Sequence, residues 1–137
     1  MEKLLASYEQ CIALKELGFR ERVNYYFEDG VLRIYTNVTG WDFNVSFTTC
    51  ISRPTKAQVF EFFRDKYSIQ GYVSSTTVRG NKEGKKFSDY CWTINGIDMG
   101  FIRTDARDME DVTFEKAETA CIDTLLEIVR LNKHQVV

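Results

Sequence analysis

RPTKAQVFEFFRDKY, residues 53–67, is the stretch that decides the predicted fold. Thr55 and Gln58 have the spacing of a capping box, in which each side chain bonds the other residue's backbone N–H at a helix start. The apolar residues that follow cover more than one narrow stripe of a helix. We therefore expect a helix that ends near Tyr67 and contributes to the core through Val59, Phe60, Phe62 and Phe63.

Two further helices are predicted near the ends of the chain. Ser7 and Gln10 form a second capping box, and this helix should stop at Gly18, with Phe19 folding back. Thr113 opens the third helix, in which apolar residues recur at helical spacing as far as Leu131. Helices thus flank two stretches whose apolar residues recur with a period of two.

The first of these stretches predicts a hairpin over Val23–Phe27 and Val31–Tyr35. A two-residue turn at Asp29-Gly30 would pair Phe27 with Leu32 and Tyr25 with Ile34. One face would then be apolar, made of Val23, Tyr25, Phe27, Leu32 and Ile34. A further strand is expected between Trp41 and Cys50, where Phe43, Val45 and Phe47 alternate with other residues.

The second stretch predicts another hairpin, centred on Asn95-Gly96. This dipeptide favours a two-residue turn, because both central residues need a positive φ. Pairing outward from it opposes Ile94 with Ile97, Trp92 with Met99 and Tyr90 with Phe101, and Ile102 lies on the other face. Residues 70–79 should form a strand that a Gly- and Lys-containing loop joins to Phe87.

This order of elements predicts a two-layer α+β fold. Strands joined by short turns form antiparallel sheets, so we expect one antiparallel sheet of about five to six strands packed against three helices. The chain has 137 residues, 44% of them hydrophobic, with ten Phe, seven Tyr, two Trp and one Pro. That composition is typical of a packed core, and we expect residues 1–137 to form a single domain.

Three segments of the chain resemble a known group of proteins. SYEQCIALKELGF (7–19), RPTKAQVFEFFRDKY (53–67) and TFEKAETACIDTLLEIVRL (113–131) are similar to segments that recur in this order in small uncharacterised proteins encoded by bacteriophages and mobile elements of gut Bacteroidetes. The resemblance implies a phage or mobile-element gene expressed in a bacterial cytoplasm. The resemblance implies no activity and no catalytic residues.

The residues themselves indicate no enzyme, no cofactor and no metal. His134 is the only histidine, and its place near the end of the chain is a poor platform for a catalytic triad. Residues 80–86 resemble a phosphate loop but lack the following helix, and the acidic residues of 105–111 lack the spacing of a calcium loop. The four cysteines lie far apart, as in a reduced protein without a zinc site. An enzyme is the third hypothesis, to be revived by a deep pocket lined by Asp, Glu or Arg.

The second hypothesis is nucleic-acid binding through the basic loop 79–86. Arg79, Lys82, Lys85 and Lys86 could contact phosphates, and Tyr72, Phe87, Tyr90 and Trp92 lie on the flanking strands. The hairpin register weakens it, because Tyr90 and Trp92 share a face with core residues. The formal net charge of -2 also argues against a protein that coats nucleic acid.

The leading hypothesis is a non-enzymatic cytoplasmic protein that acts by protein–protein contact. It could be a phage or mobile-element accessory factor bound to an unknown protein partner, or a homo-oligomer. Apolar side chains on the outer strand faces favour such contacts, and Tyr26 and Tyr35 are the predicted interface. The charged start of the chain does not match a signal peptide, and we expect no membrane partner.

Overall fold

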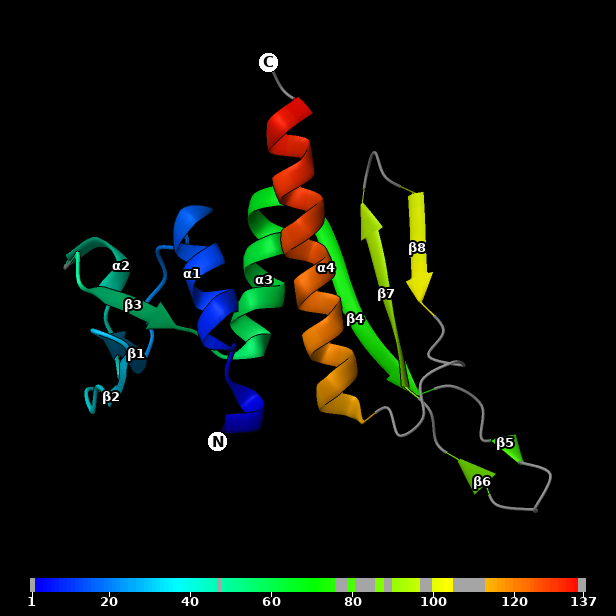
Figure 1. Ribbon diagram of the computed structural model, residues 1–137, viewed down its shortest axis with the longest axis horizontal. Helices are drawn as coiled ribbons and strands as arrows, with labels where there is room; N and C mark the ends of the chain where they lie inside the picture. The colour runs from blue at the N-terminus through cyan, green and yellow to red at the C-terminus, as the bar shows by residue number, and fades with distance from the viewer. Residues whose placement is uncertain are drawn as a thin grey trace. The chain divides into compact units, whose positions relative to one another are not determined.

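A computed structural model describes residues 2–46, 48–75, 79–80, 86–87, 90–96, 100–104 and 113–135 (Figure 1). The fold class is α+β with antiparallel sheets, as predicted. The chain divides into two compact units, residues 1–62 and 63–137, each of which is described by itself. The single domain over 1–137 stays a prediction.

The first unit contains three helical segments, a three-stranded sheet and the start of α3. The sheet has the order β2-β1-β3 and is antiparallel throughout. Its elements are a 3-10 turn η1 (Glu2–Leu4), α1 (Tyr8–Glu16), β1 (Tyr25–Glu28), β2 (Val31–Ile34), α2 (Phe43–Ser46), β3 (Cys50–Arg53) and α3 (Lys56–Tyr67), which continues into the second unit.

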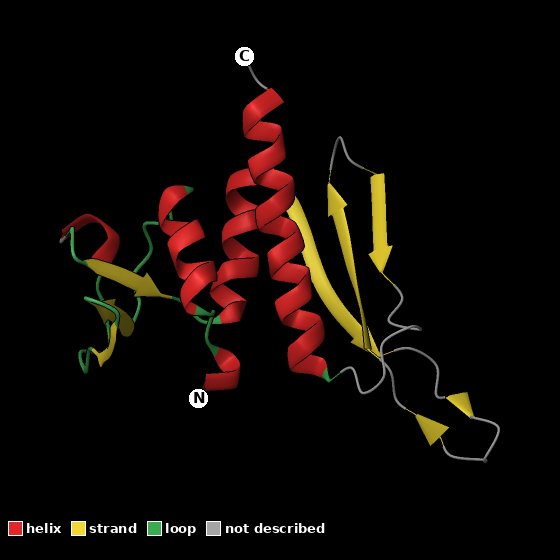
Figure 2. Cartoon of the chain, viewed as in Figure 1, coloured by secondary structure: helices red, strands yellow, loops and turns green. Residues whose placement is uncertain are grey.

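The second unit contains a three-stranded antiparallel sheet of order β4-β7-β8, a short β5-β6 pair and a long helix (Figure 2). Helix α4 packs against β4 and β7. The prediction of one sheet of five to six strands is therefore wrong, because the strands before and after α3 form separate sheets. The elements are β4 (Ile69–Ser75), β5 (Arg79–Gly80), β6 (Lys86–Phe87), β7 (Tyr90–Gly96), β8 (Gly100–Thr104) and α4 (Phe114–Gln135).

The predicted helix caps are confirmed. In α1 the Gln10 N–H donates to Ser7 Oγ at 3.2 Å, and the Ser7 N–H donates to Gln10 Oε1 at 2.9 Å. In α3 the Gln58 N–H donates to Thr55 Oγ1 at 3.1 Å, and the Thr55 N–H donates to Gln58 Oε1 at 3.0 Å. Thr113 Oγ1 accepts from the Lys116 N–H at the start of α4. Each cap satisfies backbone donors that the first helical turn leaves unpaired.

The end of α1 is also as predicted. Gly18 has φ +87°, its N–H donates to the Lys15 carbonyl, and the Phe19 N–H donates to the Leu14 carbonyl. These two bonds define a Schellman motif, in which the residue after the helix takes the left-handed conformation that glycine adopts without strain. The motif turns Phe19 inward, where it is fully buried and meets Phe62 edge to face.

The register predicted for the first hairpin is confirmed. Phe27 lies opposite Leu32 and Tyr25 lies opposite Ile34. Asp29 and Gly30 have φ of +51° and +80°, the positive values that a type I′ turn requires. Strand β3 then adds to the other side of β1.

The register predicted for the second hairpin is wrong. Ile94 pairs with Ile102 and Trp92 with Thr104, while Gly96 pairs with Gly100, so the turn is longer than the two residues Asn95-Gly96. The fully buried Ile94 therefore lies opposite Ile102, and not opposite Ile97. Ile97 and Met99 lie outside the described residues. The ladder that runs from Trp92–Thr104 to Gly96–Gly100 outweighs the local turn preference of Asn95-Gly96.

The strand predicted between Trp41 and Cys50 is also wrong. Residues 43–46 form the short helix α2, and the strand of this region is β3, which begins at Cys50. Two bonds from other parts of the chain hold α2. The Phe43 N–H donates to Ser52 Oγ at 3.1 Å, and the Asn44 amide donates to the Phe19 carbonyl at 2.9 Å. Phe47 lies outside the described residues.

Arg53 is a buried charged residue of the first unit, with a side chain only 7% exposed. Its Nε donates to the Ala6 carbonyl at 2.8 Å, and its two terminal nitrogens donate to both carboxylate oxygens of Glu2 at 3.0 and 2.7 Å. The guanidinium also lies 5.1 Å from the centre of the Phe27 ring. A buried guanidinium is tolerated only where such partners replace water.

We expect Arg53→Met to lower the free energy of unfolding by about 2–4 kcal/mol, since it removes the bond to the Ala6 carbonyl and the contact with Phe27.

Glu2→Gln should lower the free energy of unfolding by less than Arg53→Met, because the Glu2 carboxylate is largely exposed. Hydrogen bonds from Arg53 hold the pKa of Glu2 below its ordinary value of 4.5. The folded state therefore gains from the ionised Glu2 above that pH, and the gain is lost as the pH falls through the lowered pKa. Urea unfolding at several pH values should show the Glu2→Gln difference vanish in acid. A difference that persisted there would contradict this assignment.

Gly30 and Gly40 provide a matched pair for a test of backbone strain. Both have positive φ, but a Cβ at Gly30 would meet nothing within 4 Å, whereas one at Gly40 would lie 2.9 Å from the Val23 carbonyl oxygen. Gly30→Ala should cost about 1 kcal/mol from strain alone. Gly40→Ala should lower the free energy of unfolding clearly more than Gly30→Ala, because the backbone bridge between Val23 and Trp41 must shift. Urea midpoints measure both, and equal losses would contradict the role of the close approach.

Candidate functional site

The two faces of the β2-β1-β3 sheet are covered to different extents. On one face, Tyr26 stacks on Phe43 of α2 with ring centres 3.9 Å apart and planes within 10°. Tyr35 meets the edge of the same Phe43 ring at 5.6 Å. Tyr26 and Tyr35 are thus half-buried within an aromatic cluster of their own chain. Their predicted role as a protein interface stays a prediction.

The opposite face carries the apolar side chains that the hairpin register predicted as core. Phe27 is buried there beneath Tyr8 of α1, with ring centres 4.9 Å apart. Helix α1 packs against β3 and leaves the β2 side of this face open. Leu32 is 39% exposed and Ile34 is 65% exposed. The register was therefore predicted correctly, but the burial of Leu32 and Ile34 was not.

The two edges of this sheet also differ. Just beyond the β1-β2 ladder, the Tyr35 N–H donates to the carbonyl of Asn24, the residue before β1. In an antiparallel ladder, hydrogen-bonded and non-hydrogen-bonded residue pairs alternate. The backbone N–H and C=O groups of Val31 and Arg33 therefore point toward β1, as those of Tyr35 do. The N–H and C=O groups of Leu32 and Ile34 point away from the sheet. Among the described residues, no strand pairs with this edge.

Side chains close the opposite edge, on β3. There the outward groups belong to Cys50 and Ser52, because Ile51 and Arg53 pair with β1. Lys15 Nζ donates to the Cys50 carbonyl at 2.8 Å, and the Ser52 N–H donates to Asn44 Oδ1 at 2.9 Å. We call the outward side of Val31–Ile34 the open edge, in contrast to the closed edge on β3.

Exposed apolar side chains continue beyond the open edge. Val31 is also exposed, and the following segment contributes Val38, Trp41 and Val45, of which Val38 is 94% exposed. Single exposed apolar residues are normal, but here they recur along one stretch of the chain that includes the open edge of β2. The segment 31–45 is therefore the candidate site of the first unit.

The basic loop of the nucleic-acid hypothesis is described only in part. Arg79 pairs with Phe87 and Gly80 with Lys86 in the short β5-β6 ladder, so the loop joins two antiparallel strands as predicted. Lys82 and Lys85 lie outside the described residues. Contact of Arg79, Lys82, Lys85 and Lys86 with nucleic acid stays a prediction.

The aromatic residues beside that loop do not share one face. Tyr72 lies opposite Thr93, whereas Trp92 lies opposite Val73, so Tyr72 and Trp92 point to opposite sides of the sheet. Tyr90 is on the Trp92 side and meets Phe114 edge to face at 5.7 Å. Stacking of successive bases needs free aromatic rings on one surface. Of Tyr72, Tyr90 and Trp92, the two that share a side are Tyr90 and Trp92, and Tyr90 already contacts Phe114 of α4.

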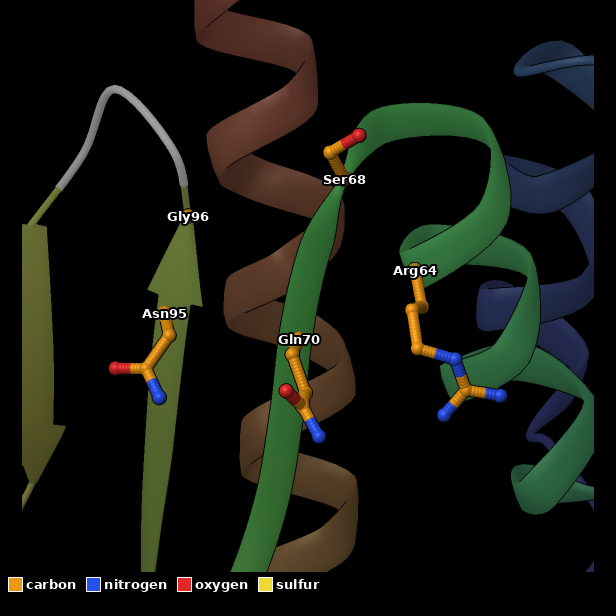
Figure 3. Close-up of a pocket in the computed structure, with 5 residues that line it drawn as sticks. All are labelled: Arg64, Ser68, Gln70, Asn95 and Gly96. Atoms are coloured by element: carbon orange, nitrogen blue, oxygen red, sulfur yellow. The ribbon is translucent and has the colours of Figure 1, made fainter.

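An open pocket of about 440 Å³ lies in the second unit, and sequence reasoning did not predict it. Figure 3 shows the Arg64 guanidinium and the Gln70 amide extending in the same direction from α3 and β4, with Ser68 at the turn between them. Asn95 and Gly96 of β7 complete the lining. Among the described lining residues there is no carboxylate, histidine or cysteine that could activate Ser68 as a nucleophile.

The cysteines are free and buried. Burial raises the pKa of both Cys11 and Cys121 to about 12, so these thiols are protonated at neutral pH. Within the described ranges, no group of three His, Cys, Asp or Glu side chains could hold a metal ion. No helix in the same part of the chain is long and apolar enough to cross a membrane.

No protein-family model, curated protein or solved structure matches this chain.

We expect Cys11 and Cys121 to resist iodoacetamide at pH 8 in the folded protein. Four pH units below a pKa of about 12, only about one thiol in ten thousand is ionised, and burial also excludes the reagent. Reactivity should rise as the pH approaches 12 or when urea unfolds the chain. Peptide mass spectrometry after timed labelling measures each site, and rapid native labelling of either cysteine would contradict the assignment.

Proposed function

We propose that this chain is a non-enzymatic protein that acts by protein–protein contact through the open edge. The observation that carries the proposal is the combination of an unpaired strand edge with exposed apolar side chains at Val31, Leu32 and Ile34. Main-chain groups of such an edge supply hydrogen bonds to an added strand, and alternate side chains supply the apolar contact. The open edge takes the place of Tyr26 and Tyr35, whose rings already contact Phe43.

The setting that the sequence resemblance implies is part of the same proposal. We place the protein in a bacterial cytoplasm, as an accessory factor of a phage or mobile element. The three segments that carry the resemblance include the capped starts of α1, α3 and α4. These residues support the fold, and the contact surface lies between the first two of them, at residues 31–45.

The test is photo-crosslinking from the open edge in the expressing bacterium. Benzoylphenylalanine in place of Ile34 should give a covalent adduct with one defined polypeptide, identified by mass spectrometry. The same residue in place of Ala57, which is exposed on α3, is the control and should give none. Leu32→Lys should weaken the Ile34 adduct by about tenfold or more, since a charge on an edge strand opposes strand addition. Equal adducts from positions 34 and 57 would overturn the proposal.

A further inference from the structure

We infer that the occupant of the open edge is a second copy of this chain, joined to the first by antiparallel pairing of β2 with β2 about a two-fold axis. The inference rests on the proposed function and names the partner. A two-fold interface uses the same patch on both copies, so the patch must be complementary to itself. The open edge meets this condition in its backbone, its apolar side chains and its charges.

The backbone fixes which registers are available. Only Leu32 and Ile34 direct N–H and C=O groups outward, and residues directly opposite each other must lie on the same face. The two-fold axis can therefore pass through position 32, 33 or 34. With the axis at position 34, Arg33 and Leu32 would lie opposite residues 35 and 36, which are outside β2, so positions 32 and 33 remain. In the first case Leu32 exchanges two hydrogen bonds with Leu32 of the second copy. In the second case Leu32 pairs with Ile34 of the second copy.

Charge decides between these two registers. With the axis at position 33, the two Arg33 side chains stand directly opposite each other, in the closer, non-bonded type of pair, and like charges there are destabilising. With the axis at position 32, Arg33 stands opposite Val31 of the second copy. The two Arg33 side chains are then diagonal neighbours and no longer stand directly opposite each other, and each lies 4.0 Å from Glu28 of its own copy.

The side chains fit the register with Leu32 on the axis. Leu32 meets Leu32 of the second copy, so apolar surface covers apolar surface. Ile34 then extends past the end of β2 of the second copy, at its Asp29-Gly30 turn, where a Cβ on Gly30 would meet nothing within 4 Å. This open space at Gly30 leaves room for Ile34, the most exposed apolar residue of β2. The strand β2 that would form the interface is only four residues long, so we expect a dimer that dissociates on dilution.

Disulfide trapping tests the occupant and the register together. Opposite residues of a bonded pair have Cα atoms about 5.5 Å apart, within the range that a disulfide spans. Leu32→Cys should crosslink two copies under mild oxidation at least about tenfold faster than Val38→Cys, a control that is exposed but lies outside the strand. Sedimentation of the unmodified protein up to about 1 mM should show a dimer that Leu32→Lys removes.

The outcomes separate this inference from the proposed function. Equal crosslinking of Leu32→Cys and Val38→Cys would overturn the two-fold pairing, as would a protein that stays monomeric at the highest concentration. Faster crosslinking of Arg33→Cys than of Leu32→Cys would overturn the register with Leu32 on the axis. An Ile34 photo-adduct with a different polypeptide would overturn the second copy as the occupant and support the proposed function. If neither a specific Ile34 adduct nor a dimer is found, both the two-fold pairing and the proposed function are overturned.

Discussion

The buried guanidinium of Arg53 is the interaction on which the first unit depends. It joins Glu2, the Ala6 carbonyl and the Phe27 ring, which belong to the start of the chain and to β1. Backbone contacts join the start of the chain to the end of β3 as well: the Ala6 N–H donates to the Pro54 carbonyl, and Leu5 forms a β-bridge with Thr55. A guanidinium stays charged at any ordinary pH, so it cannot be buried without these partners. The end of β3 therefore fixes where the chain enters α1 and where α3 begins.

The elements that the sequence predicts correctly are those with local signals. A capping box is complete within four residues, and Asp29-Gly30 sets its hairpin register through two positive φ values. The errors occur where distant contacts outweigh such signals. Asn95-Gly96 favours a tight turn, but the pairing of Ile94 with Ile102 requires a longer one. The alternation around Phe43 is typical of a strand, but bonds to Ser52 and Phe19 hold a helix there.

The candidate site could be predicted only in part, for the same reason. Alternation along β1 and β2 gives the two faces of the hairpin but does not say which face another element covers. That depends on where α1 and α2 pack, and their positions rest on Tyr8 against Phe27 and on Phe43 against Tyr26. The sequence therefore led to Tyr26 and Tyr35 as the exposed residues, whereas Leu32 and Ile34 are more exposed. The helical path of residues 43–46 is the missing information, and no local signal for it is present.

The difference between the two edges of the first sheet determines which assemblies this sheet can form. Lys15 and Asn44 close the β3 edge by bonding the Cys50 carbonyl and the Ser52 N–H, so a further strand would have to displace both side chains. A sheet with two open edges could add copies without end, as in fibrils, whereas a sheet with one open edge can add only one partner. Two-fold pairing at β2 uses up the open edge of each copy, because both remaining edges are closed. The same side chains that hold α1 and α2 on the sheet thus limit its growth to a closed pair.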